Sequence, residues 1–497
     1  MSFNPVIQTD VYKKQIAELS AQSIVECRFS QVDDVGEIIA VYPQISTSSC
    51  EVASGRINYS GRIVCTLVYV DDAGKFCRVQ KGAEFSHYAD DDNFAPSHSA
   101  ICTLKCQKTA VKREGSSIVV SVVAGAELLV FANAERTIIS GAEGVVCKTE
   151  NVNFSSAQTF FGESEVEDEF QADNVADVLV PAASAHVFRV ECSSGEVIVE
   201  GEAYLNVLAM RGNSPVSFEK TVPYKAVIPC EGGYTSKNAL CYAEVKDVSV
   251  TANVNEEAGR CEVSVVAVLG FSGVFYEEKE VPVAVDAFST QCALSLGFAE
   301  EAAYKVEAIK TYSERAIGLC AAKSKIDYSC SFKATALPSV EYFYNKETGM
   351  LEGAISSLLI YEQNGEDRST EITLPFAIPL GNLGLATEDK AQISLAVSGV
   401  SVRRKSEDEC EAEALLKIYV CAIKSKTRRY ITQLTQGEAL KINQSAISVF
   451  IPAAGEDLWA VAKRLNMTPK DVTTLNSELS FPLTGKERII IYRAKTS

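Results

Sequence analysis

The chain has few of the residues on which metal binding and enzyme chemistry most often depend. Its 497 residues include only three histidines, four methionines and one tryptophan. The sixteen cysteines include no C-x-x-C pair, and the histidines, His87, His98 and His186, are far apart. No G-x-S-x-G elbow, P-loop, H-E-x-x-H helix or dinucleotide fingerprint occurs. We therefore predict no enzyme activity, no cofactor and no metal site.

Long hydrophobic runs and a secretory leader are also missing. Uncharged windows such as residues 263–276 fall short of the roughly 18 to 20 residues that a membrane-spanning helix needs. Residues 1–20 have no basic start followed by an apolar stretch and a small-residue cleavage site. We therefore expect a cytosolic protein without membrane insertion. Cysteines scattered through apolar strand patterns, such as Cys65 and Cys261, agree with free, buried thiols in a reducing compartment.

Basic residues are scarce relative to acidic ones, with 47 Lys and Arg against 65 Asp and Glu, a net charge of -18 and a pI near 4.9. This balance disfavours nucleic acid and anionic lipid as partners. The charge is uneven, because residues 446–497 carry seven basic and five acidic residues while the rest carries 40 and 60. The C-terminal segment thus differs in sign from the body.

The pattern that is present is an internal repeat of β-strands. "GRIVCTLVYVDDAGKF" begins at Gly61, "GEAYLNVLAMRGNSPV" at Gly201 and "GAISSLLIYEQNGEDR" at Gly353. Alternate apolar residues in each copy predict a strand with one buried face. Glycines at similar offsets supply the backbone of a hairpin turn, and the following strand ends near an aromatic residue. The turn glycines are Gly74, Gly212 and Gly365, and the aromatics are Phe85, Tyr224 and Phe376.

Further strands are predicted at residues 101–111, 242–254 and 393–402, each followed by a turn and another apolar strand. Strand signals recur about every 10 to 12 residues, which favours antiparallel β-sandwiches, with a barrel as the alternative. Cys102 and Cys106 share one predicted strand face, and we expect both to pack in the core. The predicted class is mainly β, with tandem β domains at 1–155, 156–305 and 306–445 and a small unit at 446–497.

The β repeats resemble the SPOCS domain, a module associated with the spore coat of endospore-forming bacteria. The resemblance rests on "GESEVEDEF" from Gly162, "NVADVL" from residue 174, "GEVIVEGEAYLNVL" from Gly195 and the order of the repeats. The second copy matches best and the third keeps only the strand and turn around Gly353. The acidic run 163–169 lacks the spaced oxygen ligands of a calcium loop, and we expect it to be a solvated face.

The stretch "GEDLWAVAKRLNMTPKDVTTLN", residues 455–476, predicts two short helices. Apolar residues at helical spacing and Asp457 as N-cap indicate the first, and Thr468 followed by Pro469 and Asp471 begins the second. With a strand on either side, the order is β-α-α-β. This unit resembles a LysM module, although Gly455-Glu456-Asp457-Leu458-Trp459 lacks the usual threonine of the family motif.

LysM modules bind N-acetylglucosamine-containing glycans between two loops, which here are residues 453–457 and 476–485. Loops on a rigid scaffold are suited to binding, whereas we expect Trp459 to be half-buried and Asp457 to act first as a cap. The residues that the resemblance places in a partner- or glycan-binding site are Ala454, Gly455, Glu456, Asp457, Leu458, Trp459, Asn476, Ser477, Leu479 and Thr484.

SPOCS-like repeats followed by a LysM module are similar to the SipL family of spore coat morphogenesis proteins. The resemblance implies a scaffold in the mother-cell cytosol at the forespore surface, whose LysM module binds the coat ATPase stage IV sporulation protein A. Two alternatives remain: a peptidoglycan-binding protein of the spore cortex or cell wall, and an enzyme that uses carboxylates in a β-sandwich groove.

Overall fold

Three successive groups of strands make up most of the chain, which is mainly β as predicted. The computed structural model describes residues 4–30, 35–173, 175–193, 195–230, 238–255, 260–381, 383–406, 409–440 and 447–492. Residue 174 of the "NVADVL" motif, residue 446 and residues 493–497 of the C-terminal unit lie outside the described residues.

The three groups are repeats with the same order of strand pairing. Repeat 1 contains β1 (Pro5–Phe29), β2 (Val35–Ala53), β3 (Arg56–Asp71), β4 (Phe76–Asp90), β5 (Ser99–Glu114) and β6 (Ser117–Ala142). Repeat 2 contains β7 (Val146–Asp173), β8 (Val178–Ser193), β9 (Glu196–Arg211), β10 (Ser214–Pro229), β11 (Leu240–Asn255) and β12 (Arg260–Phe288). Repeat 3 contains β13 (Cys292–Val306), β14 (Lys310–Ala322), β15 (Ser331–Asn345), β16 (Met350–Gln363), β17 (Glu366–Pro379), β18 (Lys390–Arg404) and β19 (Cys410–Ala439).

Each repeat consists of two antiparallel sheets. One sheet is a meander of the second, third and fourth strands, and in the other sheet the last strand lies between the first and the fifth. In repeat 3 the first strand is divided into β13 and β14, and the end of β14 also pairs with β17, which joins the two sheets. The two sheets of a repeat share one apolar core, as where Val199 and Leu205 of β9 meet Val263 and Leu269 of β12.

The strand pairing places the repeats at residues 5–142, 146–288 and 292–439. The predicted boundary at 155/156 therefore falls inside β7, and the boundary at 305/306 falls at the end of β13. The sequence pattern marked the meanders, but it did not show that each repeat opens with a strand of the other sheet.

The predicted hairpin turns are present at the three glycines named from the sequence. Gly74, Gly212 and Gly365 have φ of 80°, 59° and 80°, which L-residues with side chains rarely adopt. The buried face predicted for the first copy is also correct, because Ile63, Cys65 and Leu67 are each 0% exposed.

The repeats also pack against one another, because equivalent positions from all three meet in common cores. Val68, Leu208 and Ile360 lie seven positions after the three leading glycines, and all three belong to one buried cluster. A second shared cluster joins Phe131 of repeat 1, Val274 of repeat 2 and other residues of repeats 2 and 3. These strands are therefore buried on both faces, by their own repeat on one face and by the other repeats on the other.

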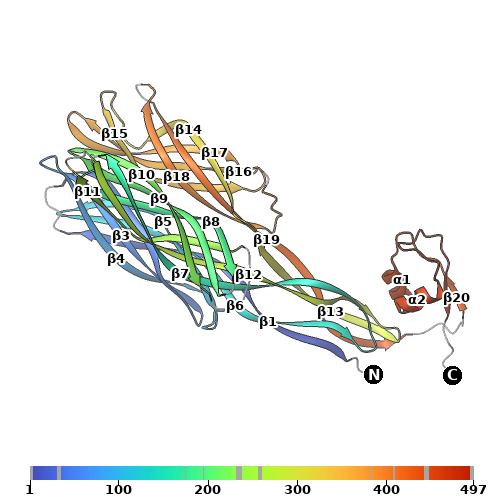
Figure 1. Cartoon of the computed structure of the whole chain (residues 1–497). Helices are drawn as coiled ribbons and strands as arrows, with labels where there is room; N and C mark the ends of the chain where they lie inside the picture. The colour runs from blue at the N-terminus through green and yellow to red at the C-terminus, as the bar shows by residue number, and fades with distance from the viewer. Residues whose placement is uncertain are drawn as a thin grey trace.

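The first and last strands of the repeats continue beyond the sandwiches as a narrow stalk (Figure 1). β6, β12 and β19 contain 26, 29 and 30 residues, far more than the usual five or six. Apolar side chains from all three repeats fill the stalk, and one of its buried clusters consists of Ile138, Phe154, Val281, Val283 and Tyr430.

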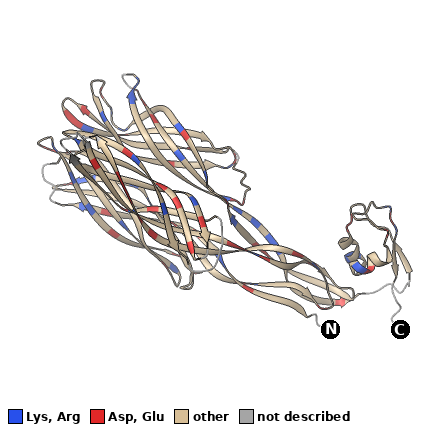
Figure 2. Ribbon diagram, viewed as in Figure 1, with Lys and Arg blue, Asp and Glu red and all other residues tan. Residues whose placement is uncertain are grey.

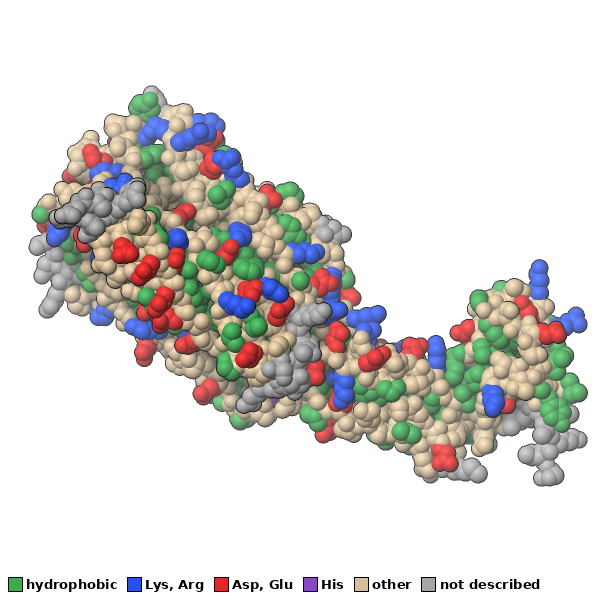
Figure 3. Space-filling model, viewed as in Figure 1, with side chains coloured by type: hydrophobic (Ala, Val, Ile, Leu, Met, Phe, Trp, Pro, Cys, Tyr) green, Lys and Arg blue, Asp and Glu red, His purple; other side chains and the backbone are tan. Residues whose placement is uncertain are grey.

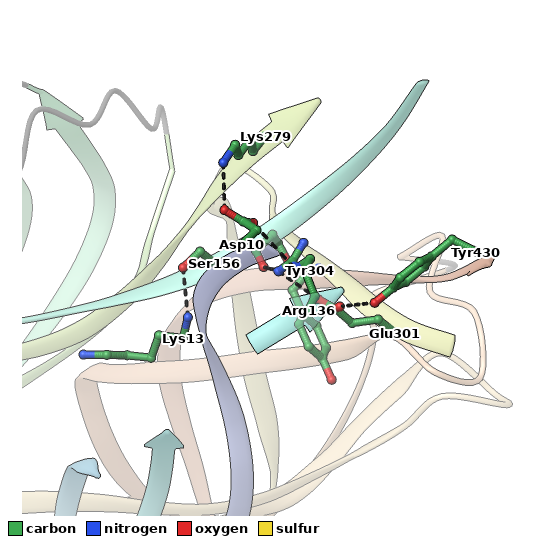
Figure 4. Close-up of polar contacts among 9 residues, drawn as sticks. Asp10, Lys13, Arg136, Ser156, Lys279, Glu301, Tyr304 and Tyr430 are labelled. Carbon is green, nitrogen blue, oxygen red and sulfur yellow. Dashed lines mark hydrogen bonds and ion pairs between the residues drawn. The ribbon is translucent and has the colours of Figure 1, made fainter. Parts of the chain in front are cut away.

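A buried arginine joins the three repeats where the stalk begins (Figure 4). Arg136 of β6 is 3% exposed. Its Nη2 lies 3.0 Å from Oε1 of Glu301 and donates to the carbonyl of Ser155 at 3.3 Å, while its Nε lies 3.7 Å from Oδ2 of Asp10. Asp10, Ser155 and Glu301 lie on β1, β7 and β13. One guanidinium thus contacts the first strand of every repeat.

Aromatic rings cover the same guanidinium. Its Cζ lies 3.7 Å from the ring centroid of Tyr12 and 4.4 Å from that of Phe154, distances at which a cation is attracted to the ring face. Burial raises the pKa of Glu301, and the charge of Arg136 opposes that rise. Burial outweighs the arginine in this balance, so the net pKa of Glu301 is above its ordinary value.

Charged residues elsewhere are distributed over the strands with both signs interspersed (Figure 2). Along β7, Glu163, Glu165, Glu167 and Glu169 are all exposed, so the predicted solvated acidic face is confirmed.

The cysteines are less uniformly buried than expected. All sixteen are free and most are buried or half-buried, but Cys106 is exposed, because β5 bulges directly after it. The prediction that Cys106 packs in the core was wrong.

Candidate functional site

The C-terminal unit contains the residues that the sequence predicts to bind a partner. Its elements are β20 (Ile447–Phe450), α1 (Leu458–Leu465), α2 (Pro469–Leu475) and β21 (Ile489–Tyr492), and β20 pairs antiparallel with β21. The apolar stripe of α1 packs with α2 and β21 in a small core that includes Val461, Leu465 and Val472. This core fixes the loops between the elements.

Both helices begin where their capping residues predict. The carboxylate of Asp457 accepts a hydrogen bond from the amide of Ala460 at 2.7 Å, and the hydroxyl of Thr468 accepts one from the amide of Asp471 at 3.1 Å. The hydroxyl of Thr468 also donates to Oδ2 of Asp471 at 2.6 Å. Asp471 is shorter than the glutamate of a capping box, and it binds the cap side chain instead of the cap amide.

The two predicted binding loops lie against each other. The amide of Gly455 donates to the carbonyl of Leu483 at 2.7 Å, and the amide of Leu483 donates to the carbonyl of Glu456 at 2.9 Å. Gly455 has φ of 88°, and a Cβ on Gly485 would lie 3.0 Å from the amide nitrogen of Ala454. The structure therefore brings residues 453–457 and 476–485 together at one end of the unit.

Most polar side chains in these loops are bonded within the unit. Glu456 accepts from the amide of Ala453 at 2.7 Å and from Arg464 at 2.8 Å. The amide group of Asn476 donates to the carbonyl of Ile490 at 2.9 Å, and its oxygen accepts from the Ile490 amide at 2.7 Å. These side chains hold the loops in place, so their hydrogen-bonding groups are already in use.

Thr484 has the same internal role. Its amide and hydroxyl both donate to Glu487, at 3.0 Å and 2.8 Å, and these bonds, led by that of the amide, lower the pKa of Glu487 to about 2. Leu458 and Leu479 are half-buried against the small core, whereas Ala454 and Ser477 are exposed.

Trp459 fixes the unit to the tip of the stalk. Its indole Nε1 donates to Oδ2 of Asp286 at 2.8 Å, and its ring packs edge-on against Phe288 with centroids 5.2 Å apart. Lys463 forms an ion pair with Oδ1 of the same aspartate at 2.6 Å. Half-burial of Trp459 was predicted, but its partners on β12 were not, since nothing in the surrounding residues marks Asp286 as a docking residue.

The face of the unit opposite its core exposes apolar side chains that sequence reasoning did not identify (Figure 3). Because side chains alternate across a strand, the outward residues of β20 and β21 form one patch together with Ile451, which directly follows β20. The exposed fractions are 67% for Ile447, 58% for Val449, 66% for Ile451, 49% for Ile490 and 54% for Tyr492. We call these five residues the apolar sheet face.

A second group of titratable residues lies between repeats 2 and 3. Glu202 of β9 accepts hydrogen bonds from Tyr204 at 2.9 Å and Tyr419 at 2.8 Å and is paired with Lys417. The ring of His186 stacks on Tyr419 with centroids 5.4 Å apart. Burial lowers the pKa of His186 to about 4. The group bonds the two repeats together and is fully engaged in doing so.

Over the parts of the chain that the structure describes, no three His, Cys, Asp or Glu residues are grouped so as to hold a metal ion. The same parts contain no helix that is both long and apolar enough to cross a membrane.

Comparison with known proteins does not identify the chain, because no family model, curated protein or solved structure matches it significantly.

Proposed function

We propose that the chain is a non-enzymatic scaffold of spore coat and envelope assembly, similar to the SipL family. In this proposal the β repeats are SPOCS-like, and the C-terminal unit is LysM-like and binds a coat ATPase resembling stage IV sporulation protein A. The protein works in the mother-cell cytosol at the forespore surface. The order β20, α1, α2, β21 and the threefold β repeat support this assignment.

The observation that carries the choice of partner is a contrast within the C-terminal unit. A glycan site needs free hydrogen-bond donors and acceptors, but Glu456, Asn476 and Thr484 use theirs inside the unit. The apolar sheet face, in contrast, is open to solvent, and contiguous apolar surface is typical of a protein contact. A protein partner therefore fits the unit better than a polysaccharide.

A binding experiment with the full chain distinguishes the two partners. The wild-type protein is incubated with the purified ATPase or with insoluble peptidoglycan, and the retained fraction is measured. Val449→Glu and Ile490→Glu place charge on the apolar sheet face, and we expect each to weaken ATPase retention by about tenfold or more, which equals about 1.4 kcal/mol. Lys470→Ala, an exposed change on α2, is the matched control.

Peptidoglycan binding is the alternative outcome. Retention by peptidoglycan but not by the ATPase would favour a cortex or cell-wall role. Weakening of that retention by Ser477→Arg or Ala454→Arg, with no effect of Val449→Glu, would place the contact in the loops instead of on the sheet. Emission of Trp459 reports in every variant whether the unit remains folded.

A further inference from the structure

Two cysteines of repeat 1 lie side by side although they are far apart in the sequence. Cys50 is on β2 and Cys102 is on β5, which belong to different sheets of the repeat. Cys50 packs against the buried cluster that contains Cys102, and both residues line the same cavity. This contact connects the two layers of the β-sandwich, so a bond between the sulfurs would fasten one sheet to the other.

Repeat 1 also contains a matched inter-sheet pair, Cys27 of β1 and Cys65 of β3. They are 1% and 0% exposed and lie within the apolar core of the repeat. The two pairs therefore have similar positions between the sheets, but only the first pair has a half-buried member, Cys50.

The Cys50–Cys102 pair lines a cavity between repeats 1 and 2. The cavity has a volume of about 390 Å³, and residues of β2, β5, β7, β11 and β12 surround it. Its polar lining includes Glu163, Glu244 and Lys246, and Lys246 is paired with Glu163 at 2.6 Å. The lining thus carries one more acidic than basic side chain, which favours entry of a neutral or cationic small molecule over an anion.

We propose that Cys50 and Cys102 are a modification site that forms an inter-sheet disulfide by exchange with a small-molecule disulfide entering this cavity. The Cys50 thiolate attacks one sulfur of the small disulfide, a mixed disulfide forms, and the other half leaves as a thiolate. Cys102 then loses its proton and attacks the Cys50 sulfur, which releases the second half as a thiol. The protein loses two hydrogens and the small disulfide is reduced to two thiols.

Their different exposure assigns the roles of the two thiols. Cys50 is half-buried, whereas Cys102 is 6% exposed, so an incoming disulfide reaches Cys50 first. Cys50 is therefore the attacking group and Cys102 the resolving one. In a reducing cytosol the pair stays as thiols, and on oxidation the bridge constrains the unfolded chain and stabilises repeat 1.

The test uses the reduced full-length chain and cystamine, a cationic small disulfide. After timed exposure the remaining thiols are alkylated, and the linked and alkylated peptides are identified by mass spectrometry. We expect a Cys50–Cys102 linked peptide while Cys27 and Cys65 are still recovered as thiols. Exposed Cys106 serves as an internal control, because it accepts only a mixed disulfide.

Two variants separate exchange at this site from general oxidation. In Cys102→Ala, Cys50 stops at the mixed disulfide, whereas Cys27→Ala leaves the reaction at Cys50 unchanged. The oxidised wild type melts at a higher temperature than the reduced protein, and dithiothreitol reverses that rise. The proposal is overturned if Cys50 and Cys102 remain thiols after Cys106 has reacted fully, or if Cys27 and Cys65 become linked at the same rate.

Discussion

Tyr224 fills the space that a side chain at position 201 would occupy. Gly201 and Tyr224 are cross-strand partners on β9 and β10, and a Cβ on Gly201 would lie 2.3 Å from the tyrosine Oη. An aromatic ring over a cross-strand glycine covers backbone that would otherwise be open to water. The same relationship joins Gly61 to Phe85 and Gly353 to Phe376.

This relationship predicts that Gly201→Ala destabilises the protein. The new Cβ would clash with the ring of Tyr224 and with the carbonyl of His186, also 2.3 Å away, so one of them must move. We expect a loss of about 1 to 3 kcal/mol, the usual range for overpacking, measured by urea denaturation. Gly141→Ala is the control, because a Cβ there meets nothing within 4 Å. Equal denaturation midpoints for the two variants would contradict the packing argument.

The repeat was predictable from the sequence because leading glycine, alternating apolar residues, turn glycine and aromatic are all local signals. The packing of the three repeats against one another could not be predicted from the sequence. Val68, Leu208 and Ile360 occupy the strand face that alternation assigns to solvent, and they are buried only because the other repeats cover them. A strand covered on both faces by partners distant in sequence loses the period that would identify it.

The candidate site likewise has one part that could be predicted from the sequence and one part that could not. Capping at Asp457 and Thr468 depends on residues next to each helix, so it could be predicted, and the structure confirms it. Docking of the unit through Asp286 and the apolar sheet face depend on the tertiary arrangement. In the sequence, a short strand with exposed isoleucines cannot be distinguished from a strand whose isoleucines are buried.

Removal of the buried arginine should weaken the junction of the three repeats. Arg136→Met keeps most of the volume but leaves half-buried Glu301 without its cation, whereas Asp10 keeps its ion pair with Lys279. Breaking a buried ion pair from one side costs about 3 to 5 kcal/mol. We therefore expect the free energy of unfolding, measured by urea denaturation, to fall by about that amount.

An exposed ion pair provides the comparison for this change. Arg56 lies 3.7 Å from Asp90, and both side chains are more than half exposed. Arg56→Met should change the stability by less than about 1 kcal/mol. If Arg136→Met were as mild as Arg56→Met, the guanidinium would not be what holds the repeats together.

His186 should make the stability depend on pH between about 4 and 6.5. Burial lowers the folded-state pKa from 6.5 to about 4, so the unfolded chain binds the proton first as the pH falls. Stability is complete above pH 6.5 and declines by about 3 kcal/mol on approach to pH 4. Urea midpoints at pH 7 and pH 4.5 measure this change. In His186→Gln the difference in stability between the two pH values should be smaller. The same pH dependence in both proteins would exclude His186 as the cause.

The C-terminal unit should separate from the stalk when Asp286 is replaced by alanine. Asp286→Ala removes the acceptor of the Trp459 indole and the ion-pair partner of Lys463, while the small core of the unit stays intact. Because Trp459 is the only tryptophan, the fluorescence of the protein reports on the surroundings of this residue. We expect emission at longer wavelength, stronger quenching by acrylamide and lower anisotropy, since the unit then rotates independently of the body. Glu280→Ala, which removes an exposed carboxylate from the same strand, should leave all three unchanged. Unaltered fluorescence in Asp286→Ala would mean that the contact of Trp459 with Phe288 holds the unit without the aspartate.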